Sequence, residues 1–369
     1  MSPLRAAQSS RRGVLTAANR GCYRKPLLRT HVVSEKLGSK RKIDTPQVRM
    51  PTTPDSASGK ISRAQGCLLG QLAGDALGSL VEFQSADEIR RTYPNSVREL
   101  ADGGTWKTIA GQPTDDSEMA LILARMLVEQ RRYDADQARQ AYSFWLDSGP
   151  FDCGHTVRSG LRGQPNLASQ ANGAMMRVSP LGIFGANYDL RQVAEWARQD
   201  AVLTHPNPVC LQANALFAKA IAYGISTGCG FQELYQQIAA WAREMEAEVA
   251  LLESITGASM APPSDYLHQQ GWVLIAFGNA LWQLLHARNF EGGVVDTVMR
   301  GGDTDTNAAI TGALLGAVYG RAAVPIRWVE KILSCRPEAG QPHIRRPRPR
   351  CFWPVDALEL AEQLVSPAR

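Results

Sequence analysis

The chain contains 369 residues, of which 44% are hydrophobic and 20% charged, a composition that is typical of a globular protein and excludes a fibrous or wholly disordered one. Its formal net charge of +5 is distributed unevenly, because residues 1–50 hold twelve Lys or Arg and only two acids. A basic segment with a charge of +10 therefore precedes a mildly acidic body with a charge of −5.

Residues 1–60 show no helical or strand periodicity and are rich in basic, Pro, Thr and Ser residues. Low hydrophobicity combined with like charge does not offset the entropy lost on folding, so we expect this N-terminal extension to be largely irregular and flexible on its own. Three roles fit its composition: a solvated tail, a segment that orders on an acidic protein or nucleic-acid partner, or an organelle transit peptide, although no clear amphipathic helix supports the last.

From residue 61 onward, apolar residues recur with helical spacing, and Gly and Pro separate the segments. In one segment, for example, Met119, Ile122 and Met126 follow helical spacing. We therefore predict an all-α domain over residues 61–369. The clearest predicted helices span 62–79, 117–130, 136–147, 190–201, 208–225, 231–253, 271–286, 290–301 and 307–319.

The first and last of these helices carry small residues at three- and four-residue spacing, among them Gly70 and Gly74 in one and Gly312 and Gly316 in the other. Glycine inside a helix costs about 1 kcal/mol relative to alanine. The repeated pattern therefore favours two central helices whose backbones pack closely in the core.

The most apolar segment, 272–285, contains two amides and is shorter than the roughly 20 residues that cross a bilayer, so we predict no membrane association. The seven cysteines are dispersed without a CxxC pair, which favours reduced thiols and a cytoplasmic location. The basic stretch 345–350 is interrupted by prolines, and we interpret it as solvated surface. No nucleic-acid-binding motif is present, so we predict no specific nucleic-acid partner.

Two acidic clusters, at 114–118 and 301–307, each stand directly before an apolar helix. One interpretation is helix capping, since Asp, Thr and Ser are preferred N-caps, and Thr114 or Asp115 with Glu118 nearby resembles a capping box. The other is a bound cation. A helix cap needs one oxygen atom, whereas the two clusters supply four aspartates. Two carboxylates 4 Å apart repel by about 4 kcal/mol at an effective dielectric constant of 20, and a bound cation would neutralise this repulsion.

Carboxylates and hydroxyls without Cys or His select a hard ion such as Mg²⁺, Mn²⁺ or Ca²⁺. The pair Gly301 and Gly302 would let the backbone come close to a ligand. Asp75 stands among small apolar residues, where a buried acid needs a partner, and Glu82 follows it. Two weaker candidates are the loops at 151–156 and 172–177.

Six segments stand in order along the chain: GDALGSLVEF (74–83), TDDSEM (114–119), DCGHT (152–156), NGAMMR (172–177), THP (204–206) and GGDTDTNAAITGALLGAVYG (301–320). This set resembles the ADP-ribosylglycohydrolase family, and most nearly its dinitrogenase reductase-activating glycohydrolase-like branch. The likeness covers roughly residues 62–320, and the N-terminal extension has no counterpart in the minimal family pattern.

The resemblance implies a compact all-α fold with a binuclear site for two divalent cations, Mg²⁺ or Mn²⁺. The implied metal ligands are Thr114, Asp115, Asp116, Asp303, Asp305 and Thr306, and the implied catalytic carboxylates are Asp152 and Glu82. The expected substrate contacts are His155, Asn172, Gly173, Arg177, Gly301 and Gly302. His155 stands where the family motif usually has asparagine, a departure that bears on substrate contact.

The implied reaction is metal-dependent hydrolysis of the N-glycosidic bond between ADP-ribose and an arginine side chain of a modified protein, which reverses the action of an ADP-ribosyltransferase. An alternative is an immunity-type protein whose residues 1–60 bind and block an ADP-ribosyltransferase toxin, with hydrolysis as a second protective activity. A terpene-cyclase-like Mg²⁺ site is a third interpretation, which the sequence after Asp115 disfavours because the final acid of DDxxD is missing.

Overall fold

The computed structural model describes residues 57–366, and every regular element in this range is a helix, which confirms the predicted all-α fold. The expectations for the N-terminal extension, including its irregular structure and its binding of a partner, fall on residues outside the described range, except that residues 57–60 are described and are helical. The helices are α1 Ala57–Gly78, α2 Ala86–Thr92, α3 Asp115–Gln130, α4 Ala135–Asp147, α5 His155–Leu161, α6 Ser179–Gly185, α7 Leu190–Val202, α8 Pro208–Thr227, α9 Phe231–Glu244, α10 Val249–Gly257, α11 Val273–His286, α12 Phe290–Val298, α13 Thr304–Tyr319, α14 Ile326–Ser334 and α15 Ala357–Val365, with 3₁₀ turns at Arg321–Ala323 and Arg350–Phe352.

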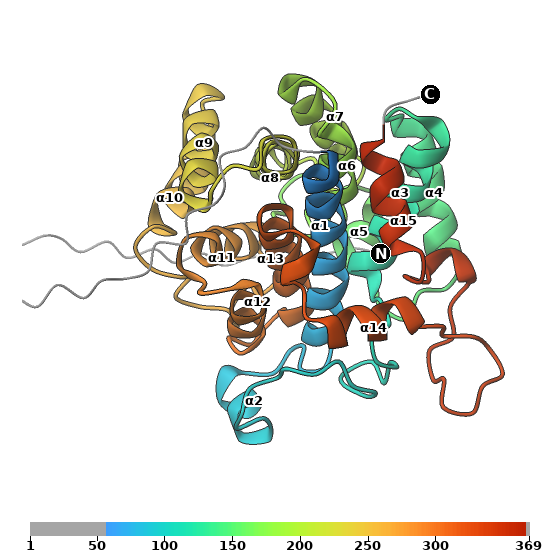
Figure 1. Cartoon of the computed structure of the whole chain (residues 1–369). Helices are drawn as coiled ribbons and strands as arrows, with labels where there is room; N and C mark the ends of the chain where they lie inside the picture. The colour runs from blue at the N-terminus through green and yellow to red at the C-terminus, as the bar shows by residue number, and fades with distance from the viewer. Residues whose placement is uncertain (1–56, 367–369) are drawn as a thin grey trace, which may run out of the picture. The chain divides into compact units, whose positions relative to one another are not determined.

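Helices α1 and α13 lie side by side at the centre of this helical domain and make its most extensive helix–helix contact (Figure 1). A Cβ atom on Gly70 would lie 2.1 Å from the carbonyl oxygen of Gly312, and one on Gly74 would lie 2.0 Å from that of Ala308. The glycines therefore allow close backbone packing, as the sequence pattern predicted. The same contact brings the C-terminal end of α1 against the first turn of α13.

Replacing Gly74 by alanine is expected to lower the free energy of unfolding by about 3 kcal/mol, because the added methyl group meets backbone atoms of α13. Gly257, at the end of α10, has open space where its Cβ would lie. The Gly257→Ala variant is therefore a matched control that should keep or slightly raise the stability. Urea denaturation measures both, and equal stabilities would contradict the close-packing interpretation.

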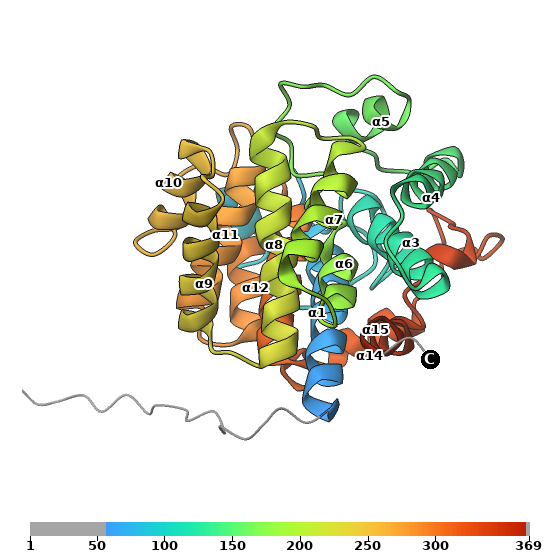
Figure 2. The ribbon, with the colours of Figure 1, turned by 90° about the horizontal axis from the view of Figure 1, so that it is seen from above.

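Figure 2 shows α3, α4 and α15 on one side of α1, and α8, α9, α11 and α12 on its other side. Helices α3 and α15 pack beside α1, whereas α8, α11 and α12 contact α13 from the opposite side. Helix α8 is long and apolar enough to cross a membrane (mean hydropathy 1.2). However, 72% of its most apolar 18-residue stretch is buried inside the protein, as in a core helix. Helix α11, which contains most of the segment 272–285, is shorter.

Most predicted helices begin and end within three residues of the observed ones, and two differ more. Helix α1 begins at Ala57, five residues before the predicted start at 62. The predicted helix at 231–253 is two helices, α9 and α10, which are separated where Glu246 takes a left-handed conformation with φ of 51°. An apolar pattern that continues across the break concealed this turn from sequence reasoning.

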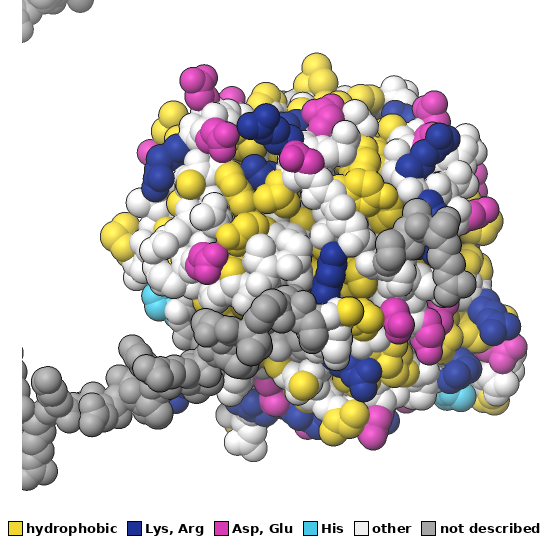
Figure 3. All heavy atoms as spheres, turned by 45° about the horizontal axis from the view of Figure 1, so that its top comes forward, with side chains coloured by type: hydrophobic (Ala, Val, Ile, Leu, Met, Phe, Trp, Pro, Cys, Tyr) yellow, Lys and Arg dark blue, Asp and Glu magenta, His cyan; other side chains and the backbone are white. Residues whose placement is uncertain are grey.

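Charged side chains of both signs are interspersed over the face shown in Figure 3. The excess of Lys and Arg lies in residues 1–50, and residues 51–369 have a negative net charge. On this face the basic side chains do not gather into the kind of strip that follows a nucleic-acid backbone.

Candidate metal centre

The two acidic clusters meet where the first turns of α3 and α13 come together. Asp116 of α3 and Asp305 of α13 join Asp75 of α1 in a group whose carboxylate oxygens lie within 4.8 Å of one another. A second group of the same size joins Asp305 to Glu82 and Asp152. Because Asp305 belongs to both groups, the two are adjacent, as a cation site built from both clusters requires.

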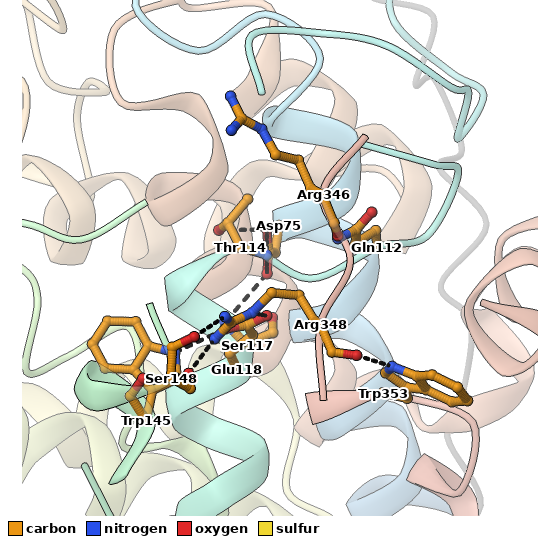
Figure 4. Close-up of polar contacts among 10 residues, drawn as sticks. All are labelled: Asp75, Gln112, Thr114, Ser117, Glu118, Trp145, Ser148, Arg346, Arg348 and Trp353. Atoms are coloured by element: carbon orange, nitrogen blue, oxygen red, sulfur yellow. Dashed lines mark hydrogen bonds and ion pairs between the residues drawn. The ribbon is translucent and has the colours of Figure 1, made fainter. Parts of the chain in front are cut away.

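Asp75 holds the first acidic cluster in place through hydrogen bonds (Figure 4). Its two carboxylate oxygens accept from the backbone N–H of Thr114 at 3.1 and 3.2 Å, and one of them accepts from the N–H of Ser117 at 3.2 Å. The Thr114 hydroxyl donates to the same carboxylate at 2.9 Å. The buried acid that stood without a partner in the sequence is therefore an anchor for the N-terminal end of α3.

Helix capping does not account for the acids of the two clusters. Thr114 is the N-cap residue of α3 and Asp303 that of α13, but neither side chain makes a capping hydrogen bond. Glu118 does not complete a capping box with Thr114, since its carboxylate accepts from Trp145 Nε1 at 2.8 Å and from Arg348. The cluster carboxylates thus keep oxygen atoms available for another group.

Gly301 and Gly302 pack against the protein itself. Both have a positive φ (80° and 77°), and a Cβ on Gly302 would lie 1.8 Å from the carbonyl oxygen of Tyr266. The N–H of Phe83 donates to the carbonyl of Gly302 at 2.8 Å, which holds the neighbouring Glu82 beside the second cluster. Neither glycine lines the cavity described below, so their contact with substrate stays a prediction.

Burial raises the pKa of every cluster carboxyl, and repulsion from neighbouring carboxylates adds to this in most of them. The pKa rises to about 6 for Asp115, about 8 for Glu82 and about 10 for Asp152. The pKa values of Asp116, Asp303 and Asp305 are raised by the same desolvation. A site with this much concentrated negative charge favours a bound cation.

The donor atoms present fit a hard divalent cation. Asp116 Oδ1 is buried without a hydrogen-bond partner in the described part of the chain, while Oδ2 lies 3.1 Å from the Thr114 hydroxyl oxygen. A buried carboxylate oxygen left unpaired is costly, so a cation explains its retention. The hydroxyl of Thr306 lies within hydrogen-bonding reach of Asp116 and Asp303, which completes a set made of oxygen donors alone.

A cavity of about 230 Å³ opens onto the second carboxylate group. A neighbouring groove of about 630 Å³ shares Ala171, Gln270 and Gly271 with it and extends the space for a ligand. The acidic residues that line the cavity are Glu82, Asp115, Asp152, Asp303 and Asp305. Among these, Glu82 is oriented by a hydrogen bond from Trp106 Nε1.

Three of the predicted substrate contacts line this cavity. Asn172 lies beside the second cluster and donates from Nδ2 to Asp303 Oδ2 at 2.7 Å. At Gly173 a Cβ would come within 2.8 Å of the Val157 side chain, so only glycine leaves this wall of the cavity undisturbed. His155 is exposed at the start of α5 and also faces the cavity.

Arg177 does not line the cavity, and the prediction that it contacts substrate is wrong. Its side chain is fully buried and donates from Nε to Asp200 Oδ2 at 3.0 Å and from Nη1 to the Thr204 hydroxyl at 2.9 Å. The guanidinium also packs over the Tyr142 ring at 4.4 Å. A buried charge needs such partners, and motif position alone does not distinguish an internal arginine from one that binds an anion.

His205 lines the cavity but was not among the predicted site residues. Its Nδ1 lies 2.7 Å from the Thr204 hydroxyl, and its Nε2 is buried without a partner within the described residues. Burial, with help from Arg177, lowers the pKa of the imidazole to about 3, so the ring is neutral near pH 7. The signal for it in the sequence was the THP motif, whose histidine can turn a ring nitrogen toward a ligand.

The all-α fold and the carboxylate-lined cavity at the α3–α13 junction define a hydrolase of the ADP-ribosylglycohydrolase class. The ADP-ribosylglycohydrolase family model matches residues 56–365, and the chain belongs to this family, in which activity depends on metal. The chain is similar to the ADP-ribosyl-[dinitrogen reductase] glycohydrolase of Rhodospirillum rubrum, with 30% identity over 284 residues that cover 73% of this chain and 90% of the relative.

Two further comparisons agree with this assignment. The ADP-ribosylarginine hydrolase Tri1 of Pseudomonas putida is 28% identical over 297 residues, which cover 76% of each chain. A solved structure of an ADP-ribosylglycohydrolase-related protein complex superposes with a TM-score of 0.68 and 28% identity, over 84% of this chain and 98% of that one. The predicted family resemblance is therefore confirmed.

Proposed function

We propose that this protein is a divalent-cation-dependent hydrolase that releases ADP-ribose from arginine side chains of a modified protein. The observation that carries this proposal is the pair of adjacent carboxylate groups that share Asp305 beside a cavity. The acceptor is inferred from two similar proteins, one named an ADP-ribosylarginine hydrolase and the other a glycohydrolase for ADP-ribosyl-dinitrogen reductase.

Two ions, Mg²⁺ or Mn²⁺, are the proposed cofactors. Their ligands would come from Thr114, Asp115, Asp116, Asp303, Asp305 and Thr306, the oxygen donors of the two clusters. When bound, such ions orient hydroxyl groups of a sugar and lower the pKa of a water molecule.

Glu82 and Asp152 are the proposed residues for proton transfer at the scissile bond. Both face the cavity, and both belong to the carboxylate group that is centred on Asp305. Trp106 fixes the position of Glu82, while Asp115 and Asp152 are close enough to share a hydrogen bond. His205 offers a neutral ring nitrogen and His155 an exposed imidazole to the polar part of the substrate.

Purified protein tests this function when it is supplied with arginine-linked and serine-linked ADP-ribosyl proteins in Mg²⁺, Mn²⁺ or EDTA. We expect release of ADP-ribose from the arginine-linked substrate, loss of release in EDTA and recovery when Mn²⁺ is added in excess. Unchanged release in EDTA would overturn the cation dependence. Release from the serine-linked substrate alone would overturn the choice of acceptor.

A further inference from the structure

The segment that follows α14 crosses the N-terminal end of α3 as an irregular strap, residues 336–356, and carries the basic stretch at 345–350. The interpretation of this stretch as solvated surface is wrong for Arg348, which is only 6% exposed. The strap is held by its own backbone: the N–H of Arg348 donates to the carbonyl of Pro337, and Trp353 Nε1 donates to the carbonyl of Arg348 at 2.7 Å.

Arg348 connects two of the segments that bear site carboxylates (Figure 4). It donates to both oxygens of Glu118, from Nε at 2.7 Å and from Nη2 at 2.8 Å, and Glu118 stands two residues after Asp116 on the first turn of α3. It also donates from Nη2 to the hydroxyl of Ser148 at 2.8 Å, at the end of α4. The chain after Ser148 leads within four residues to Asp152.

The same strap reaches the segment that orients Glu82. Arg346 donates from Nε to the carbonyl of Trp106 at 2.9 Å, and its guanidinium lies over the Phe151 ring at 5.7 Å. The carbonyl of Arg346 accepts from Gln112 Nε2, two residues before the first acidic cluster. Trp106 in turn donates to Glu82.

We propose that residues 336–356 brace the metal centre, with Arg348 as a positioning residue that fixes Asp115 and Asp116 relative to Asp152. The inference rests on the proposed function, since it assigns this pair of segments to the cation site. The bidentate geometry supports it, because a planar guanidinium holds a carboxylate and a hydroxyl in fixed relative positions as a flexible lysine does not. Groups that hydrogen-bond metal ligands typically change metal affinity by about 10- to 100-fold when they are removed, and we expect Arg348, which holds the segments that carry the ligands, to act in the same range.

Arg125 provides a matched control on the same helix. It also ties α3 to the strap region through the carbonyl of Cys351 (2.8 Å) and through both oxygens of Asp356 (2.7 and 2.8 Å). It lies seven residues beyond Glu118, away from the carboxylate groups. Losing either arginine removes a tie between α3 and the C-terminal part of the chain, but only Arg348 also contacts the segment that leads to Asp152.

Hydrogen exchange of the metal-free protein, followed by Mn²⁺ titration with electron paramagnetic resonance, tests the brace in full-length variants. Arg348→Met should speed exchange in both 105–118 and 148–154 and weaken Mn²⁺ binding by about 10- to 100-fold. Arg125→Met should leave exchange in 148–154 unchanged and keep Mn²⁺ affinity within about twofold of the wild type.

A double variant, Arg348→Met with Glu118→Met, separates positioning from the cost of an unpaired buried charge, and it also serves if Arg348→Met alone fails to fold. We expect the double variant to recover the thermal midpoint but not the Mn²⁺ affinity. Recovery of both, or unchanged exchange in 148–154, would overturn the brace. Failure of the wild type to bind Mn²⁺ would instead overturn the proposed function, while the exchange pattern still decides the inference.

Discussion

Replacing Asp305 by asparagine is expected to abolish hydrolysis while raising the thermal stability of the metal-free protein. Asp305 is 1% exposed and is the one residue common to the two carboxylate groups. Loss of its charge should weaken cation binding at both carboxylate groups, and a loss of about 4 kcal/mol of transition-state stabilisation lowers turnover on the order of a thousandfold. The stability should rise because Glu82 and Asp116 lose a buried neighbour of the same charge.

The measurement combines kcat/KM for ADP-ribose release with thermal midpoints taken with and without Mn²⁺. Asparagine keeps the size of the side chain and the oxygen that accepts from the N–H of Thr306 at 3.0 Å, so the helical circular dichroism spectrum should be unchanged. Asp87→Asn is the control, since Asp87 forms an exposed ion pair with Arg90 that contributes little. A variant that retains a Mn²⁺-dependent rise of its midpoint would disprove the central role of Asp305.

The metal-free protein is expected to lose stability as the pH rises from 6.5 to 8, and saturating Mg²⁺ or Mn²⁺ should remove this loss. The pKa values in the folded state are raised, to about 8 for Glu82 and about 10 for Asp152, above the ordinary values near 4 that apply when the chain is unfolded. The folded state therefore binds more protons than the unfolded one. The stability that this proton binding contributes is complete below about pH 4, and it is lost as the pH rises through the pKa values of the folded state.

The window from pH 6.5 to 8 reports on the buried cluster carboxyls together, among them Asp75, whose pKa is raised by burial to about 7. His205, whose pKa is lowered to about 3, adds to the pH dependence only below its ordinary value of 6.5. The buried cysteines have raised pKa values and their effect begins at more alkaline pH, because the thiols of the unfolded chain titrate near 8.5.

Thermal midpoints across this window, in EDTA and in excess Mn²⁺, measure the effect. Each kcal/mol lost should lower the midpoint by about 2–4 °C. Bound cations keep the carboxylates charged, so the rise caused by Mn²⁺ should be larger at pH 8 than at pH 6.5. A metal-free midpoint that is higher at pH 8 would mean that the cluster carboxyls are not the buried, mutually repelling groups described above.

Much of the site was accessible from local sequence. The clusters at 114–118 and 301–307 stand at helix starts, and their surplus of aspartates over what a cap needs indicated a cation. The glycine spacing in α1 and α13 predicted their close contact, because glycine destabilises a helix interior and is seldom placed there repeatedly unless two backbones must approach closely. The order of the six motifs then indicated the family that the comparisons confirm.

Other features of the site could not be predicted, because a residue's role there depends on neighbours that are distant in the sequence. Arg177 ends a site motif, but its guanidinium donates hydrogen bonds to Asp200 and Thr204 in the protein interior. Gly302 precedes the second cluster, but its close approach is to the carbonyl of Tyr266. Arg348 stands in a proline-rich basic stretch, and its partner Glu118 lies 230 residues earlier in the chain.

The chemistry of the ligands and the helical class thus follow from the amino-acid sequence alone, because residue type and short-range spacing determine which ions an oxygen cluster prefers and which face of a helix is buried. Which acids meet, and which of the basic and glycine residues support them, was decided only in three dimensions. Asp75, Asp116 and Asp305 come together because glycines let the backbone of α1 pack closely against that of α13. No spacing along the chain encodes the distance between segments that are so far apart in the sequence.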